Sequence, residues 1–385
     1  MPLLAITFVD VLGFTILIPI LPFYAEHFGA SPTTVGAIYA TLAVCSLLSS
    51  PFWGRLSDRI GRKGVLIAAQ VAGLLGFSLL AAGTSLWTIF VARAIEGLGG
   101  GGFGVTQAYV TDVTRPSERA RAFGLVGATF GFGFLIGPAL ASVLVRYGYA
   151  VPFWTAAGLQ LLTVVLTIVL LPESRGAVKT APTLAEVRAS LRSPVLGRLI
   201  LTQFAFALAF TSWVTVFALF AERVVGFGAP QTANTFILSS VVAIVVQLAL
   251  IGRLVDRYGE GRVAIAGLAC AVCAYAGVGF VTAPAMLFPF IVLWSLSGAL
   301  IRPALGALLS EAAPADQRGT ILSVNDSFNY LAFLISPFLS TTVLRLNPHL
   351  TGIVPTVFAT LAILIGYRVF AAPRPQPVTE GIEAA

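Results

Sequence analysis

The eight residues GRLSDRIG at positions 54–61 recur as GRLVDRYG at positions 252–259. Glycine, arginine, leucine, aspartate, arginine and glycine occupy the same places in both copies. Each copy follows an apolar run, at 33–53 and at 230–252, that is about as long as a bilayer-spanning helix. A polar loop repeated at the same place in two apolar series indicates that the chain consists of two related halves.

The composition decides the broad class. The 385 residues are 57% hydrophobic and only 10% charged, whereas soluble domains carry about 25% charged residues. We therefore interpret the chain as an integral membrane protein. The net charge of +7 would suit nucleic acid in a soluble protein. Here the basic residues lie in short clusters between apolar runs, so we expect membrane loops and no nucleic-acid partner.

Twelve apolar runs are long enough to cross a bilayer as helices, which need about 20 residues. They lie at 3–25, 33–53, 65–84, 86–110, 121–146, 149–171, 197–222, 230–252, 263–283, 285–309, 320–345 and 350–371. None alternates in segments of about ten residues, as the strands of a membrane barrel do. The sequence predicts an all-α integral membrane protein with twelve transmembrane helices.

The longest polar connection, at 172–196, separates the two series of six runs. We expect a first six-helix bundle at 1–171, a linker at 172–196, a second bundle at 197–371 and a tail at 372–385. The connections after even-numbered runs carry most of the lysines and arginines, whereas those after odd-numbered runs hold only Arg146, Arg223 and Arg345. By the positive-inside rule, the linker and both termini are predicted to be cytoplasmic.

No cofactor or metal site is expected. Cys45, Cys270 and Cys273 lie in apolar runs, and no neighbouring histidine completes a zinc ligand set. The stretch GLGGGG at 97–102 satisfies the pattern of a dinucleotide-binding loop, but no strand precedes it and it lies inside an apolar run. We expect these glycines to form a thin helix segment that lines a cavity or lets a neighbouring helix approach closely.

Ionisable residues inside the apolar runs are candidates for function, because a charge at the bilayer centre costs about 2.5–3.5 kcal/mol. They are Asp10, Arg93, Glu96, Arg302 and Asp326. Arg93 and Glu96 are three residues apart and could pair, and Arg302 and Asp326 lie at similar depths in consecutive runs. Sequence spacing supplies no partner for Asp10, and a buried carboxylate without one favours its protonated form. Asp10 is therefore the first candidate for proton coupling, followed by Glu96 and Asp326.

Other side chains in the runs could contact a substrate, as amides and aromatic rings do in apolar pockets. With the two arginines, Arg93 and Arg302, the substrate-cavity candidates are Gln107, Gln203, Trp213, Asn325 and Asn329. For Asn325 and Asn329, polar contact between helices is an equal alternative.

Four stretches carry a family resemblance. GRLSDRIGRK (54–63) resembles the loop signature of the major facilitator superfamily, and RAIEG (93–97) resembles the arginine-bearing motif of its drug:proton antiporters. Gly124, Gly133, Gly137 and Pro138 reproduce the spacing of the antiporter motif. The stretches at 10–22 and 108–124 are similar to the tetracycline/proton exporters.

The resemblance implies two pseudo-symmetric six-helix bundles, with helices 1, 4, 7 and 10 lining a central cavity. It implies that Asp58 caps helix 11 and that Arg62 pairs with an acid at the end of helix 4, for which Asp112 fits. The residues of the conformational gate would be Gly54, Asp58, Arg59, Gly61, Arg62, Asp112, Gly133, Gly137, Pro138 and Asp256.

The function that this resemblance implies is a transporter, not an enzyme. We expect a monomeric, multi-pass protein of a bacterial inner membrane, in contact with lipid, that exchanges protons for a drug-like or other small organic compound by alternating access. The alternative is a proton symporter or facilitator for a sugar or an organic anion, which Arg93 and Arg302 would suit. A membrane enzyme is disfavoured because no histidine pair or nucleophile motif lies at one interface.

Overall fold

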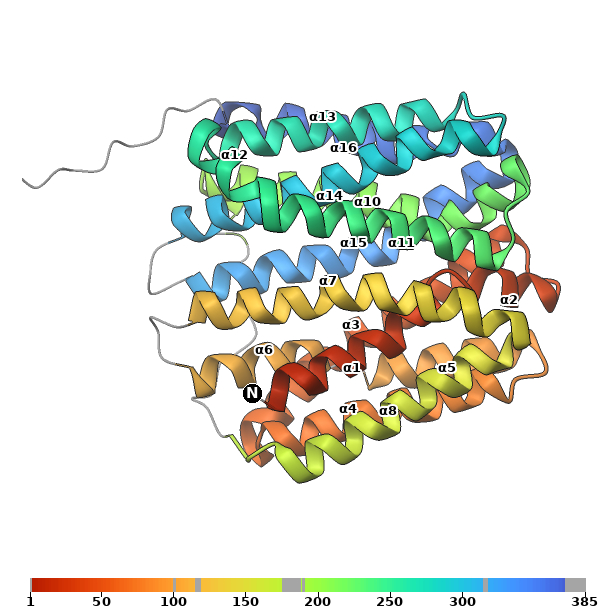
Figure 1. Cartoon of the computed structure of the whole chain (residues 1–385). Coiled ribbons are helices and arrows are strands. Elements are labelled where there is room, and N and C mark those ends of the chain that lie inside the picture. The colour runs from red at the N-terminus through yellow and green to blue at the C-terminus, as the bar shows by residue number, and fades with distance from the viewer. Residues whose placement is uncertain are drawn as a thin grey trace, which may run out of the picture.

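The computed structural model describes residues 2–99, 102–114, 119–174, 188, 191–313 and 318–370. Within these ranges all the regular elements are helices, and they run roughly parallel to one another (Figure 1). The predicted fold class, an all-α integral membrane protein, is confirmed.

The first group of helices precedes the linker. It consists of α1 (Pro2–Leu17), α2 (Leu21–His27), α3 (Pro32–Ile60), α4 (Arg62–Ala81), α5 (Leu86–Leu98), α6 (Gly102–Val113), α7 (Arg119–Leu144), the short η1 (Val145–Tyr147) and α8 (Ala150–Leu170).

The second group follows the linker. It consists of α10 (Leu196–Val225), α11 (Ala229–Val245), the π-helical η2 (Val246–Leu250), α12 (Ile251–Tyr258), α13 (Glu260–Val278), α14 (Pro284–Ala312), α15 (Arg318–Leu346), η3 (Pro348–Leu350) and α16 (Ile353–Phe370).

Each of the twelve predicted runs contains one helix or one interrupted series of helices. Nine of the described helices are long and apolar enough to cross a membrane, and α1 with α2 makes a tenth span with a bend of 43°. The bend falls at Ile18–Ile20, which includes Pro19 and is followed by Pro22, because a proline lacks the N–H that would continue the helix. In the predicted run at 86–110, residues 100–101 between α5 and α6 lie outside the described part.

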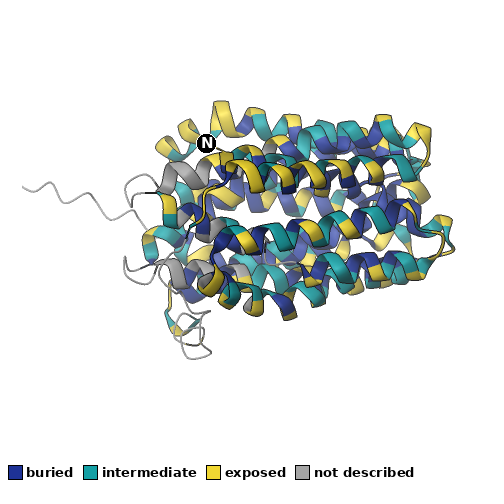
Figure 2. Ribbon diagram, turned by 90° about the horizontal axis from the view of Figure 1, so that it is seen from below, coloured by how far each residue is buried: buried dark blue, intermediate teal, exposed yellow. Residues whose placement is uncertain are grey.

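The connections define two ends of the molecule. We call one the linker end, where α8 ends at Leu170 and α10 begins at Leu196. The opposite end, which we call the hairpin end, carries short connections at 28–31, 82–85 and 226–228 and lies on the side of α2 in Figure 1. Exposed positions follow the outward faces of the helices along their length, as expected for contact with lipid (Figure 2).

The two groups meet along two seams. In one, α3 packs against α15, and in the other α7 packs against α11. Gly36 of α3 lies so close to α15 that an added Cβ atom would be 2.6 Å from Oγ1 of Thr341 and 3.1 Å from the carbonyl oxygen of Pro337. In the second seam Ser240 donates a hydrogen bond of 2.8 Å to the carbonyl oxygen of Phe134.

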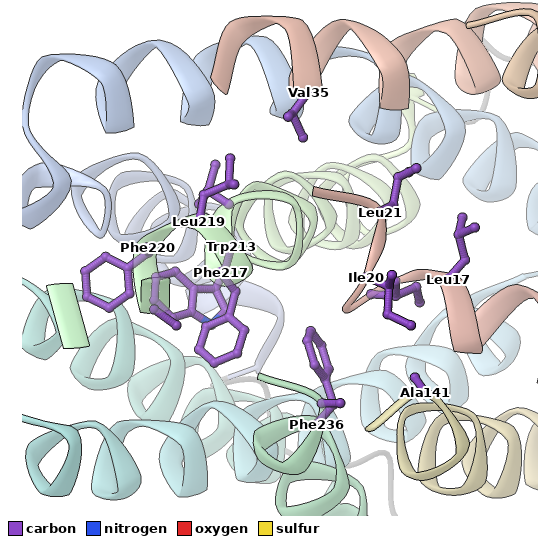
Figure 3. Packing of buried hydrophobic residues seen from close by; sticks show 14 of the residues in the cluster. Leu17, Ile20, Leu21, Val35, Ala141, Trp213, Phe217, Leu219, Phe220 and Phe236 are labelled. Atoms are coloured by element: carbon purple, nitrogen blue, oxygen red, sulfur yellow. The ribbon is translucent and has the colours of Figure 1, made fainter. Parts of the chain in front are cut away.

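A hydrophobic core seals the hairpin end. It combines side chains of the first group, such as Leu17 and Ile20, with Trp213, Phe217 and Phe220 of the second group (Figure 3). Toward the linker end, the described buried residues form separate cores, one within each group. In the described part of the chain, the groups are therefore closed against each other at the hairpin end and share no core at the linker end.

Candidate functional site

Asp10 lies half-buried in the middle of α1 and has a partner that sequence spacing did not supply. Nε2 of Gln160, a buried residue of α8, donates a hydrogen bond of 2.8 Å to its Oδ1. The sequence interpretation of Asp10 as partnerless is thus corrected. The partner is neutral, and an amide N–H can donate to a carboxylate or to the carbonyl oxygen of the protonated acid. Gln160 therefore fixes the position of Asp10 without fixing its charge.

Arg93 and Glu96 form the predicted pair on α5. The Arg93 guanidinium donates to Oε1 of Glu96; the Arg93 side chain is buried and that of Glu96 is 9% exposed. The ring of Phe77 lies 6.0 Å from Cζ of Arg93. Nε of Arg93 has no hydrogen-bond partner among the described groups.

Both acidic sites lie against one face of α4. A Cβ atom added at Gly73 would be 3.1 Å from the amide of Gln160, and one added at Gly76 would overlap the side chain of Glu96. Residues three apart on a helix share a face. These two glycines therefore make room for the Asp10–Gln160 pair and for Glu96 side by side, which brings the two leading candidates for proton coupling into one buried region.

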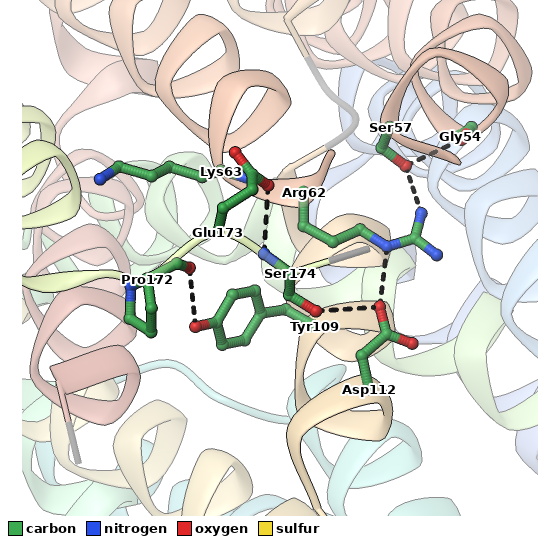
Figure 4. A network of polar contacts seen from close by, with 9 residues as sticks. All are labelled: Gly54, Ser57, Arg62, Lys63, Tyr109, Asp112, Pro172, Glu173 and Ser174. Atoms are coloured by element: carbon green, nitrogen blue, oxygen red, sulfur yellow. Dashed lines mark hydrogen bonds and ion pairs between the residues drawn. The ribbon is translucent and has the colours of Figure 1, made fainter. Parts of the chain in front are cut away.

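Arg62 organises the linker end of the first group (Figure 4). Its Nε lies 3.0 Å from Oδ2 of Asp112, so the ion pair expected between these residues is present. Nη1 donates a 2.6 Å hydrogen bond to Oγ of Ser57, which in turn donates to the carbonyl oxygen of Gly54. Ser174, after α8, donates at 3.4 Å to Asp112. The network ties the first loop copy to the ends of α6 and α8.

Gly61 shows why the loop copies end in glycine. Its φ of 102° is a left-handed value that glycine adopts most easily, and Gly259 at the equivalent place has φ of 83°. An added Cβ atom at Gly61 would also overlap the carboxylate of Glu173, whose Oε1 accepts hydrogen bonds from the backbone of Lys63 and Ser174. Sequence reasoning missed Glu173 and Ser174, because they belong to the connection after α8, remote from the loop in sequence.

Other gate candidates are placed only in part. Arg59 and Asp256 are exposed, and the side chain of Asp58 lies outside the described part, so its capping role is untested. Gly133 and Gly137, one turn apart on α7, lie directly against Val11 and Thr15 of α1.

The hydroxyl of Thr15 donates to the carbonyl oxygen of Gly133 at 2.9 Å. Gly133 and Gly137, which precede Pro138 inside the helix, thus allow α7 to pack closely against α1.

The glycines of 97–102 serve helix packing where the structure describes them. A Cβ atom at Gly97 would lie 2.5 Å from Cβ of Cys45 and 2.6 Å from the carbonyl oxygen of Leu42 on α3. Gly99 lies against Ala72 of α4. Gly97 and Gly99 thus let α5 approach two neighbouring helices, and in the described residues no strand precedes them.

The cavity candidates of the second group occupy different environments. Trp213 is buried in the hairpin-end core, Asn325 is buried with its Oδ1 unpaired among the described groups, and Arg302 is exposed. Gln203 and Asn329 are half-buried. The side chains of Gln107 and Asp326 lie outside the described part, so the expected Arg302–Asp326 pair is untested.

An ion pair joins the groups at the hairpin end. Nη2 of Arg223 on α10 lies 2.9 Å from Oε1 of Glu26 on α2. Burial, and then the nearby carboxylates of Glu222 and Glu26, raise the pKa of Tyr149, which precedes α8. Among the described residues, no three His, Cys, Asp or Glu side chains are grouped as metal ligands.

Known proteins resemble this chain along most of its length. The family model of the Major Facilitator Superfamily matches residues 3–337 and, in a second match, residues 236–385. Multidrug resistance protein 2 of Bacillus subtilis (strain 168) is 31% identical over 378 residues, which cover 94% of this chain and 92% of that protein. Tetracycline resistance protein, class D, of Salmonella ordonez is 29% identical and covers 87% of each chain. The solved structure of the human organic anion transporter MFSD10 (TETRAN) has a TM-score of 0.74 at 21% identity, over 95% of this chain and 97% of that one.

Two helix groups that pack along paired seams, with ionisable side chains inside the spans, have the architecture of a secondary membrane transporter. The chain belongs to the Major Facilitator Superfamily. It is a multi-pass membrane protein that transports by alternating access, in which a central site faces each side of the membrane in turn.

Proposed function

We propose that the protein is a proton-coupled antiporter that exports drug-like or other small organic compounds. The observation that carries this proposal is the placement of Glu96, and of Asp10 through its partner Gln160, against one face of α4 inside the membrane spans. Ionisable groups at membrane depth are costly and mark ion or proton pathways. The names of the relatives, which are multidrug and tetracycline resistance proteins, support a drug-like substrate.

The halves at 1–171 and 197–371 would move as units about the two seams. With both termini cytoplasmic, as the arginine distribution predicts, the linker end faces the cytoplasm. The described arrangement, closed at the hairpin end, would then accept a substrate from the cytoplasm. Opening of the hairpin end would release the substrate outside and admit protons to Asp10 and Glu96.

Competition between proton and substrate would couple the two movements. A ligand shifts a conformational equilibrium only by its different affinity for the two states. Protonation of the acids and binding of substrate would each favour a different facing of the cavity. The working unit would be a monomer in the inner membrane of a bacterium.

The test uses everted membrane vesicles with an acidified interior and a fluorescent pH reporter. Tetracyclines, lipophilic cations, fluoroquinolones and organic acids would be added to the wild type, to Asp10→Asn and to Glu96→Gln. Glu311→Gln, at an exposed carboxylate near the end of α14, is the matched control. We expect a compound in the panel to cause proton release that the control retains and at least one buried-acid variant loses.

Two outcomes would contradict the proposal in different ways. Proton release that survives both buried-acid substitutions would keep antiport and remove the assignment of its proton site. Proton-coupled movement of an organic acid in the import direction, without a response to any drug, would instead identify a symporter.

A further inference from the structure

A stack of aromatic rings runs through the second group from Phe210, which is half-buried, to the hairpin-end core. Phe210 stacks on Trp294 with ring centroids 5.8 Å apart, and Trp294 stacks on Phe217 at 6.1 Å. Phe236 meets Trp294 edge-on at 5.9 Å. Three helices, α10, α11 and α14, contribute to this stack. Such contacts hold the rings in fixed orientations.

Arg302 lies over the open end of the stack. Its Cζ atom is 4.5 Å from the ring centroid of Phe210, and the side chain is exposed although it lies ten residues, about 15 Å, inside the end of α14 at Ala312. No ion pair to Arg302 occurs among the side chains that the structure describes. One face of the guanidinium therefore covers Phe210, and no described carboxylate occupies its N–H donors.

A buried polar contact lies behind the stack. The side chains of Trp294 and Tyr275 are both buried, and the indole N–H of Trp294 lies within hydrogen-bonding reach of the Tyr275 hydroxyl. Trp294 therefore supports the ring of Phe210 in one orientation. Arg302 supplies the positive charge on this side of the stack, and that charge favours an acidic ligand.

We propose that Arg302, Phe210 and Trp294 form a subsite that selects exported compounds with a planar aromatic ring bearing a carboxylate or similar acidic group. The ring would pack against the half-buried side chain of Phe210, and the acidic group would accept hydrogen bonds from Arg302, whose planar fork matches a carboxylate. The same charge repels lipophilic cations, so the subsite discriminates against them. This proposal rests on the proposed export function, whose substrate class it narrows.

The test measures binding to the purified protein in lipid nanodiscs by calorimetry, which requires no proton gradient. The probes are a planar quinolone carboxylic acid, its methyl ester and ethidium. We expect the wild type to bind the acid at least tenfold more tightly than the ester. In Arg302→Gln the affinities for the acid and the ester should differ by less than twofold, because the acid loses affinity and the ester does not.

Three further variants separate specific from general effects. Arg302→Lys keeps the charge without the fork and should retain part of the ratio. Phe210→Leu should weaken binding of acid and ester alike, because both rings lose the aromatic surface. Arg253→Gln, at an exposed arginine on α12, should change neither. Folding of each variant is checked by gel filtration. If Arg302→Gln does not fold, the subsite is tested by the acid-to-ester ratio of the wild type and by the smaller ratio expected for Arg302→Lys.

Equal binding of acid and ester by the wild type, or equal weakening of both by Arg302→Gln, would overturn the subsite. Failure of the wild type to bind both the acid and the ester would also overturn the subsite. Acid-selective binding without proton release in vesicles would support the subsite and contradict the antiport mechanism. Proton release driven by ethidium, with no preference for the acid, would leave antiport standing and remove the subsite.

Discussion

Replacement of Gly36 by alanine should shift the protein away from the arrangement described above. Gly36 belongs to the α3–α15 seam, which joins the two groups near the hairpin end. The added methyl group would stand 2.6 Å from Oγ1 of Thr341, against an ordinary contact of at least 3.4 Å. Rotation of Thr341 gives no relief, because its Cγ2 atom and the carbonyl oxygen of Pro337 are each only 3.1 Å away. The helices must separate by roughly 1 Å.

The size of the shift follows from the cost of overpacking. Extra methyl groups in a well-packed site typically cost about 1–3 kcal/mol. Alanine also improves helix propensity by about 0.5–1 kcal/mol, but that gain is the same in both facings because α3 stays helical in each. The equilibrium should therefore move about 5–150-fold toward the facing in which the hairpin end is open.

Pulsed electron spin resonance in nanodiscs can measure this shift. Spin labels would be placed at Trp87→Cys on α5 and Phe280→Cys beyond α13, which are 78% and 75% exposed at the hairpin end. The native cysteines, Cys45, Cys270 and Cys273, would first be replaced by serine. The Gly36→Ala variant should show a larger population at long label separations than its parent.

Gly158→Ala on α8 is the matched control, since an added Cβ atom there meets nothing within 4 Å. It should leave the distance distribution unchanged. The reasoning fails if Gly36→Ala gives the same distribution as the control while both variants fold. That result would mean that the α3–α15 seam does not open during the exchange between facings.

Three further substitutions test separate features. Asp10→Asn should abolish substrate-driven proton release in vesicles. It should keep the melting temperature within a few degrees, since an amide oxygen can still accept the hydrogen bond that Gln160 donates to Oδ1. Proton release that survives this substitution would contradict the role of Asp10 in proton coupling. Gly137→Ala, which forces a methyl group against Thr15 within the first group, should destabilise the fold by about 1–3 kcal/mol without changing the label distances, as thermal unfolding and spin resonance would report. Arg223→Gln removes a partly exposed ion pair with Glu26 worth about 0.2–1 kcal/mol. The equilibrium should therefore shift toward an open hairpin end by about fivefold at most, and by less at high salt. A hundredfold shift would refute this reasoning.

Hydropathy and the loop repeat predicted most of the architecture. The spans follow from the need to satisfy every backbone polar group within the membrane, which a continuous apolar helix does. The break at Ile18–Ile20 was not anticipated, because the run at 3–25 is apolar enough to read as one span and hydropathy does not register the missing N–H groups of Pro19 and Pro22. Hydropathy also does not register the change of hydrogen-bond pattern in the π-helical turn at Val246–Leu250.

The candidate site was predictable where its parts are local in sequence. Arg93 and Glu96 are one helical turn apart, so spacing alone predicted the pair. Gln160 is 150 positions from Asp10, and only the packing of α1 against α8 brings them together. Trp294 was missed for a similar reason, because an apolar helix with one tryptophan does not reveal which rings from other helices surround it.

The seal at the hairpin end also has a thermal consequence. It is formed mainly by aliphatic and aromatic side chains such as Ile20, Phe217 and Phe220, and opening that end hydrates part of this surface. Hydration of apolar surface raises the heat capacity, so the balance between facings should curve with temperature, and cooling should loosen the seal. Relatives from cold habitats would then need more polar contacts of the Arg223–Glu26 kind to keep the cell from leaking protons when no substrate is bound.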